Sequence, residues 1–379
     1  MPVLYILVAL LVVILAALWL GTRRTTRLPD RHKAEGHSAT ARALPSDPPP
    51  PPETGPSLAR PEALDRFVRI RQDQLPRTDR DALLARLRTI PRPPKALHQL
   101  VSPEFLNTAT SSALSDIVMG ESLVAAKVLA MVNSPAYNLQ TPVVGMGQAI
   151  TFLGMNTVRS ICLRYLLDDA FRAPNPAGSS PFQPVWNASS LGSELCFRVA
   201  QHWRIADAGA LSTHVVLSFL GHLAATSLHP AQTAPGASFL ARTDLEQQQL
   251  GLSAVEIGTM LMSDWALPTP LVSDVRLIDH TLDTPVTSPA TAVQTRVALA
   301  YACARLAEHL ATIPGFDLTA FAPAADDPDW YHLHQVLGTA GVQRFLVSLR
   351  TPSVGGAVQH MARQLAANTP SPGVHGQQH

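Results

Sequence analysis

The chain has 379 residues, of which 46% are hydrophobic and 15% charged, and its formal net charge is +1. This length exceeds one ordinary domain and supplies enough apolar residues for a large core. The near-neutral balance speaks against a polyanion such as nucleic acid as the main partner, because phosphates are bound by clustered Lys and Arg. Cys162, Cys196 and Cys303 lie far apart in apolar segments, which predicts buried thiols in a reducing compartment.

The first apolar segment covers residues 3–20 without a single charge, and Arg23, Arg24 and Arg27 follow it. As a helix such a run is about 27 Å long, enough to cross a bilayer core. A cleaved secretory signal would carry its positive charges before the apolar run, and a buried soluble helix is the other alternative. We predict a single transmembrane helix over residues 1–21, with the rest of the chain in the cytoplasm by the positive-inside rule.

The next two segments connect this anchor to the remainder of the chain. Residues 22–56 are rich in Arg, Ser, Thr, Ala and Pro and end in the proline run 48–52. This composition predicts a disordered linker. Residues 57–80 carry apolar and basic positions at helical spacing, which predicts a connecting amphipathic helix whose basic face is either solvated or apposed to anionic lipid.

The densest helical pattern runs over residues 112–167. An apolar helix over 123–132 is stopped by Asn133-Ser134-Pro135, because proline cannot continue a helix. The pattern restarts over 149–153, Gly154 interrupts it, and Asn156 is expected to cap the next helix. Three helices joined by two turns should therefore form one packed corner.

Helical periodicity also dominates the flanking residues, and no alternating run of strand length is present. A helix pair surrounds the break at 91–94, and the later helices are expected over 186–199, 211–228, 254–262, 271–278, 293–311, 329–347 and 354–366. We predict an all-α fold with a helical domain over 81–290, a C-terminal helical extension over 291–367 and a disordered tail over 368–379.

The order and spacing of several sequence blocks resemble the HDOD domain, an all-helical bacterial signalling module related in fold to the HD phosphohydrolases. The blocks are residues 90–94, 122–129, 133–137, 149–154, 250–251, 257–258 and 265–268. The resemblance covers about half of the chain, from residue 81 to 280. It implies a multi-helix, HD-like bundle behind the membrane helix, and hence a single-pass protein of the bacterial cytoplasmic membrane.

Catalytic HD enzymes bind metal through a consecutive His-Asp pair, and none of the 14 histidines here is followed by Asp. Where the resemblance places this pair, the chain has Gly221 and His222. We therefore expect no enzymatic activity, no metal and no cofactor. A residual metal site through His214, His222 and His229, which recur along one predicted helix, is the alternative.

The resemblance implies a non-catalytic signalling or scaffold role in which a helical groove binds a regulatory protein or a small signalling ligand. The candidate residues at the helix breaks are Asn133, Ser134, Tyr137, Gly154 and Arg159, and Asn133 is expected to tie the turn backbone. A metal-dependent phosphohydrolase and a cyclic-dinucleotide receptor are the alternative functions. A DNA-binding helix at 153–159 is disfavoured because the helix that follows is too apolar for a groove.

Overall fold

The computed structural model describes residues 59–134, 137, 139–171, 181–229, 236–286 and 290–368. Across these residues the secondary structure is helical and contains no strand, so the predicted all-α class is confirmed there. The expected transmembrane segment 1–21 and linker 22–56 lie outside the described residues, as does the expected tail apart from Asn368. All structural statements below concern the compact unit that follows residue 56.

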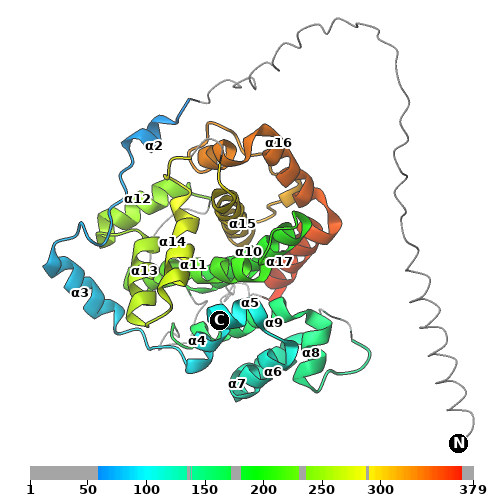
Figure 1. Cartoon of the computed structure of the whole chain (residues 1–379). Helices are drawn as coiled ribbons and strands as arrows, with labels where there is room; N and C mark the ends of the chain where they lie inside the picture. The colour runs from blue at the N-terminus through cyan, green and yellow to red at the C-terminus, as the bar shows by residue number, and fades with distance from the viewer. Residues whose placement is uncertain are drawn as a thin grey trace, which may run out of the picture. The chain divides into compact units, whose positions relative to one another are not determined.

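The helices follow one another with short connections (Figure 1). They are α2 (Glu62–Arg66), α3 (Arg77–Leu87), α4 (Lys95–Leu100), α5 (Pro103–Thr108), α6 (Ser111–Met119), α7 (Ser122–Val132), α8 (Met146–Leu153), α9 (Met155–Asp168), α10 (Gln183–His202), α11 (Ala208–Leu228), α12 (Phe239–Leu250), α13 (Ala254–Asp264), α14 (Thr269–His280), α15 (Ala292–Thr312), α16 (Tyr331–Arg350) and α17 (Ala357–Asn368), with short helices η2 (Leu318–Ala320) and η3 (Pro352–Gly356).

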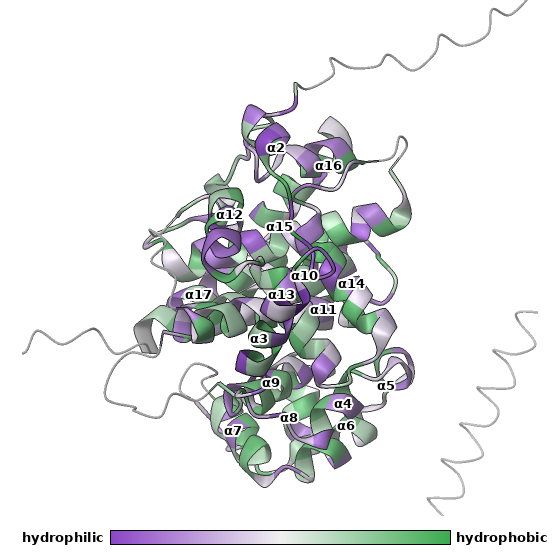
Figure 2. Ribbon diagram, turned by 90° about the vertical axis from the view of Figure 1, so that its left-hand side faces the viewer, coloured by the Kyte–Doolittle hydropathy of each residue, from purple (hydrophilic) through white to green (hydrophobic). Residues whose placement is uncertain are grey.

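Two apolar clusters form the core. The first joins the α3–α9 part of the chain to α11, α13 and α14, and the second joins α10, α11 and α15–α17. Figure 2 colours the same helices by hydropathy and shows that they carry both apolar and polar residues. Helix α11 belongs to both clusters and is, within the described residues, the one helix long and apolar enough to cross a membrane; 89% of its apolar window is buried inside the protein. It is therefore the central helix of a packed bundle.

The corner expected around residues 112–167 is present as α6–α9. Helix α7 ends at Val132 with Asn133 as its C-cap, and Gly154 separates α8 from α9 with a φ of +86°, a conformation that favours glycine. The expected capping role of Asn156 is wrong. Gly154 occupies the N-cap, and Asn156 is buried inside α9, where its amide Nδ2 donates to Ser212 Oγ at 3.1 Å.

Two other expectations differ from the structure. The amphipathic helix predicted over 57–80 is reduced to α2, and the chain then runs without helix until α3, because residues 67–72 hydrogen-bond to α12 and α13 instead. The C-terminal helices do not form a separate extension after residue 290. Helix α15 belongs to the second apolar cluster together with α10 and α11, and every residue from Ala298 to Ala307 is buried.

Candidate functional site

The site begins with a close contact between α11 and α13. Gly221 of α11 faces Gly258 of α13, and a Cβ atom added to Gly221 would lie 2.0 Å from Ala254 O. A Cβ added to Gly258 would lie 2.8 Å from Gly221 Cα. The two backbones therefore touch, and no side chain can extend from residue 221 without separating the helices.

The next residue, His222, lies between two carboxylates. Its Nδ1 is 3.7 Å from Glu246 Oε1 of α12, and its Nε2 is 3.5 Å from Asp279 Oδ2 of α14. Burial and the nearby Arg242 lower the pKa of His222, but hydrogen bonding and charge from Asp279 and Glu246 outweigh them, so its pKa is raised. The imidazole therefore lies within an internal cluster of ionisable side chains.

Two guanidinium groups complete this cluster. Arg305 of α15 is 2% exposed, and its Nη2 and Nη1 lie 3.3 Å from Asp279 Oδ1 and 2.9 Å from Glu308 Oε2. Its guanidinium carbon lies 3.7 Å from the centre of the Phe239 ring, a cation–π contact. Arg242 Nη2 binds the other oxygen of Glu308 at 2.6 Å. The carboxylates are thus neutralised by side chains of the same chain.

The charge balance fixes the protonation of the most buried carboxylate. Asp279 has no exposed surface, and burial by itself would raise its pKa. The guanidinium of Arg305, assisted by His222, reverses this effect and lowers the pKa of Asp279 to about 2. Asp279 is therefore ionised at neutral pH, and Arg305 stabilises its carboxylate form.

This donor set does not fit a metal centre. Guanidinium groups already bind the carboxylates that a divalent cation would need as ligands, and they carry the same sign of charge as that cation. Throughout the described residues, no three His, Cys, Asp or Glu side chains are grouped so that they could hold a metal ion. The alternative site through His214, His222 and His229 is not formed, and burial lowers the pKa of His214 to about 4.

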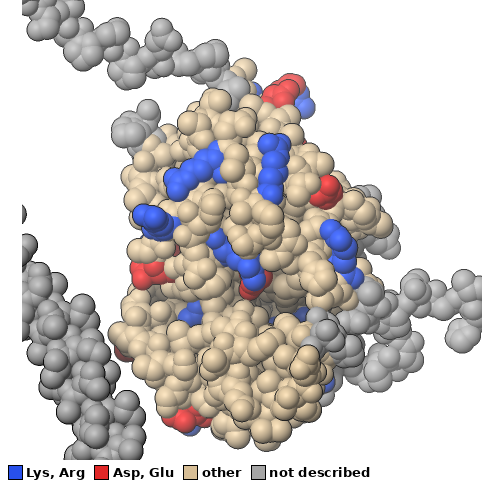
Figure 3. Space-filling view, turned by 90° about the vertical axis from the view of Figure 1, so that its right-hand side faces the viewer, with Lys and Arg blue, Asp and Glu red and all other residues tan. Residues whose placement is uncertain are grey.

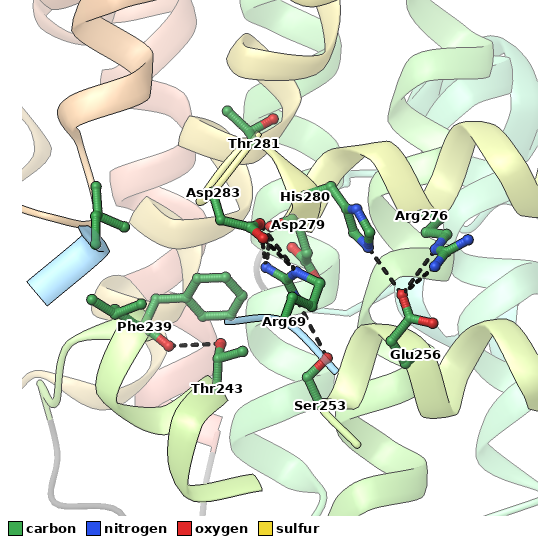
Figure 4. A network of polar contacts seen from close by, with 12 residues as sticks. Arg69, Phe239, Thr243, Ser253, Glu256, Arg276, Asp279, His280, Thr281 and Asp283 are labelled. Carbon is green, nitrogen blue, oxygen red and sulfur yellow. Dashed lines mark hydrogen bonds and ion pairs between the residues drawn. The ribbon is translucent and has the colours of Figure 1, made fainter. Parts of the chain in front are cut away.

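An N-terminal strap, residues 67–72, is joined to this cluster (Figure 4). Arg69 is buried, and its Nε and Nη2 donate to Asp283 Oδ1 at 3.0 and 2.8 Å, while Nη1 donates to Ser253 Oγ at 3.3 Å and Nη2 to Asp279 O at 3.2 Å. Gln247 pairs with the strap backbone at Ile70 N, 2.7 Å, and at Val68 O, 3.1 Å. The strap is therefore hydrogen-bonded directly to α12, to α13 and to the residues that follow α14.

A second buried carboxylate stands beside the strap. Glu256 of α13 has no exposed surface, and its Oε1 accepts from Arg276 Nη2 at 2.6 Å and lies 3.0 Å from His280 Nε2 (Figure 4). Burial would raise the pKa of Glu256, but hydrogen bonding to His280 and the charge of Arg276 lower it. The Asp279-His280 pair of the sequence thus points to two different partners, Asp279 to Arg305 and His280 to Glu256.

A cavity opens next to the ion cluster. Its volume is about 290 Å³, and His222, Arg242, Glu246 and Arg305 are among the residues that line it. Arg242 and Arg305 are both paired with Glu308, and His222 lies 3.7 Å from Glu246, so these charged groups interact with one another beside the cavity. Sequence inspection identified His222 but missed Glu246, Arg242 and Arg305, which come from other helices.

The candidate residues near the first helix break lie together at the α7–α8 corner. The Tyr137 ring packs on Phe152 with centroids 5.9 Å apart, and Ser134 follows the C-cap of α7. Asn133 Nδ2 donates to Leu129 O at 2.9 Å and to Val143 O at 2.7 Å, and its Oδ1 accepts from Val143 N at 2.7 Å. Asn133 thus ties the turn backbone, as the sequence predicted.

Replacing Asn133 with Ala removes the bonds that join the end of α7 to Val143. We expect a loss of about 1–2 kcal/mol of unfolding free energy, since each exposed hydrogen bond contributes about 0.5–1.5 kcal/mol and the three share one side chain. Thermal unfolding followed by circular dichroism measures this. An unchanged melting temperature together with lost partner binding would instead make Asn133 a contact residue.

The other two candidates lie apart from Asn133, at the start of α9. Arg159 is buried, and its Nη2 donates to Asn156 Oδ1 at 2.8 Å and to the carbonyl oxygen of Gly209. Burial lowers the pKa of Arg159 to about 10. Gly154 and Arg159 both line a second cavity, of about 440 Å³, between the α8–α9 turn and α10.

Comparisons with known proteins point to one family. The family model described as HDOD domain matches residues 90–281. No curated protein matches the chain. An HDOD domain protein of unknown function from Geobacter sulfurreducens is 16% identical over 75% of this chain and 98% of that chain, with a TM-score of 0.50. At this identity the likeness is one of fold.

Two further solved structures are among the matches. A protein from Shewanella amazonensis that bears the name phosphohydrolase is 20% identical over 75% of this chain and 98% of that chain, with a TM-score of 0.48. A protein from Marinobacter aquaeolei named for signal transduction is 20% identical over 79% of this chain and 64% of that chain, also with a TM-score of 0.48.

Proposed function

Because the chain belongs to the HDOD domain family, we propose that it is a non-catalytic signalling module that binds a regulatory protein. Residues 1–21 would anchor it in the bacterial cytoplasmic membrane, with the helical unit in the cytoplasm. The linker 22–56 would keep that unit close to the membrane and raise its effective concentration for a partner there. The membrane anchor is inferred from the sequence, and the protein partner is inferred from the family.

The observation that carries the non-catalytic part is the ion cluster around His222. The resemblance implies that Gly221 and His222 stand where an HD enzyme has its metal-binding pair. Here a Cβ on Gly221 would lie 2.0 Å from Ala254 O, and the His222 ring lies 3.7 Å from Glu246 and 3.5 Å from Asp279. Water activation needs a metal with an open coordination position or a side chain with a free base. Here Asp279 and Glu308 are already paired with arginines, which supports a binding function rather than hydrolysis.

The α6–α8 corner is the surface that best fits a protein partner. Half of the large hydrophobic side chains that are exposed in the described residues lie here, on Met119, Leu123, Val144 and Phe152. Val144 is 80% exposed and Phe152 50%. Exposed apolar side chains are typical of interaction sites, and we propose that this corner binds an apolar, helical segment of the regulatory protein.

Two assays on the detergent-solubilised full chain test this function. With added Mn²⁺ or Fe²⁺ we expect no hydrolysis of nucleotides or cyclic dinucleotides. Metal-dependent hydrolysis by the wild type that is lost when His222 alone is replaced by Ala would contradict the proposal. In the second assay the chain is used to capture proteins from membrane extracts. We expect the wild type to capture a partner protein and the Phe152→Glu variant not to capture it. The matched control is Val293→Glu, since Val293 is 54% exposed on α15, and it should capture normally.

The alternative of a cyclic-dinucleotide receptor has less support. Such a ligand carries two phosphates and needs arginines with unsatisfied charge. In the cavity beside His222, Arg242 and Arg305 are instead paired with Glu308 at 2.6 and 2.9 Å. A thermal-shift measurement with cyclic dinucleotides should therefore show no stabilisation through this cavity.

A further inference from the structure

The start of α9 is an open helix N-terminus. The helix has 14 residues, its N-cap is Gly154, which has no side chain, and its first turn carries no acidic residue. Its first helical hydrogen bond runs from Val158 N to Gly154 O at 3.1 Å, so the amides of Met155, Asn156 and Thr157 precede the ladder. Such amides, together with the helix dipole, favour an anion at this end.

A buried cation stands next to this helix end. Arg159 is 4% exposed, and among the described residues no carboxylate lies within ion-pair distance of it. Its Nη2 is held by Asn156 Oδ1 and Gly209 O, whereas its Nε is buried without a hydrogen-bond partner. A buried guanidinium with only neutral partners is costly, because nearly all buried charges in proteins are paired.

The cavity of about 440 Å³ connects these two features. Gly154, Met155, Asn156, Thr157 and Arg159 all line it, so the helix end and the guanidinium face the same space. The opposite wall is α10, where Arg198 Nε binds Glu194 Oε1 at 2.7 Å and the two charges cancel. The charge of Arg159 is therefore left without compensation. Figure 3 shows one face of the molecule, with Lys and Arg side chains spread over its upper part and a hollow below them.

We propose that this cavity binds the phosphate group of a small organic molecule, with the α9 amides and Arg159 as its anion site. Phosphate oxygens accept hydrogen bonds from backbone amides at a helix start and from a guanidinium, and a buried setting strengthens both. The rest of the ligand would lie against Leu106, Leu153 and Phe197, the apolar side chains of the same cavity. This site adds a small phosphorylated ligand to the regulatory protein of the proposed function, and it rests on the chain being a binding module.

The experiment measures binding of inorganic phosphate, ribose 5-phosphate and AMP to the full chain in detergent, by calorimetry and thermal shift. Ribose and adenosine serve as the uncharged counterparts. We expect the two organic phosphates to bind and to raise the melting temperature, inorganic phosphate to bind more weakly, and ribose and adenosine not to bind. Thr157→Glu places a carboxylate at the helix start, where it is compatible with the helix but repels the ligand, so affinity should fall at least about tenfold.

The second variant is Arg159→Lys, which keeps a charge but removes the planar fork and should also weaken binding about tenfold or more. Arg164→Lys, on the same helix but outside the cavity, is the matched control and should bind like the wild type. Binding of no probe, or equal binding by wild type and Thr157→Glu, overturns the site. Either result leaves capture of a protein by the Phe152 surface unaffected, so failure here is distinct from failure of the proposed function.

Discussion

Replacement of Gly221 by Ala is expected to lower the free energy of unfolding by about 3 kcal/mol, the upper range for overpacking a core. The added Cβ would lie 2.0 Å from Ala254 O and 2.7 Å from Ala254 C. Both atoms belong to the backbone of α13, so no side-chain rotation can relieve the contact. The helices must separate instead, and the contacts around Gly258 are lost with them. Urea unfolding monitored by circular dichroism measures the change.

Gly147 provides the matched control for this substitution. It lies in α8 and is exposed, and no atom lies within 4 Å of a Cβ built on it. Ala at this position should raise stability by up to about 1 kcal/mol, because Ala loses less backbone entropy than Gly in a helix. Equal effects of the two substitutions would show that the α11–α13 approach does not limit residue 221.

Replacement of Arg305 by Leu is expected to cost about 3–5 kcal/mol, the range for removing one partner of a buried ion pair. The loss leaves Asp279 and Glu308 buried with less compensating charge, and it also removes the stacking on Phe239. Adding Asp279→Leu to this variant should recover part of the stability, because the uncompensated carboxylate is then gone. A double-mutant cycle in urea gives the coupling energy.

An exposed ion pair is the comparison for Arg305. Arg88 binds Asp264 at 2.8 Å, but its side chain is 61% exposed. Its replacement by Leu should change stability by less than about 1 kcal/mol, since water screens such pairs. If Arg305→Leu were as mild as Arg88→Leu, the ion cluster would not hold α14 and α15 together.

Arg305→Leu should also change how the free energy of unfolding depends on pH. In the wild type, the pKa of Asp279 is lowered to about 2, below its unfolded value of about 3.9. Its contribution to stability is therefore fully present above about pH 4 and is lost as the pH falls toward 2. Without Arg305 this contribution disappears. The deficit of Arg305→Leu should accordingly be largest above pH 4 and should narrow in acid.

The sequence predicted the helical corner well because its signals are local. Proline after Ser134 stops α7, and a glycine with positive φ separates α8 from α9. The capping role of Asn156 was mispredicted because α9 begins earlier, at Met155 with Gly154 as its N-cap, and the Asn156 Oδ1 accepts from Arg159 Nη2 instead. Periodicity likewise could not show that the segment around Arg69 binds Asp283, a residue 214 positions later, rather than continuing as a helix.

For the candidate site, the sequence located His222 but not its environment. The residues that surround it come from α12, α14 and α15, and their charges pair only after the helices pack. No spacing rule links Arg305 to Asp279, which lie 26 residues apart on different helices. Arg159 was identified at a helix break, whereas its burial and the cavity beside it required the fold.

The position of α15 decides which fragments of this protein keep the second apolar cluster complete. The recognised family segment stops at residue 281, before α15 begins, yet this helix fills the centre of the second apolar cluster and supplies Arg305 to Asp279. A protein fragment that ends at residue 281 would expose the face of α10 that α15 covers. It would also leave the buried carboxylate of Asp279 without Arg305. Domain exchange or expression trials with this protein should therefore extend through α17.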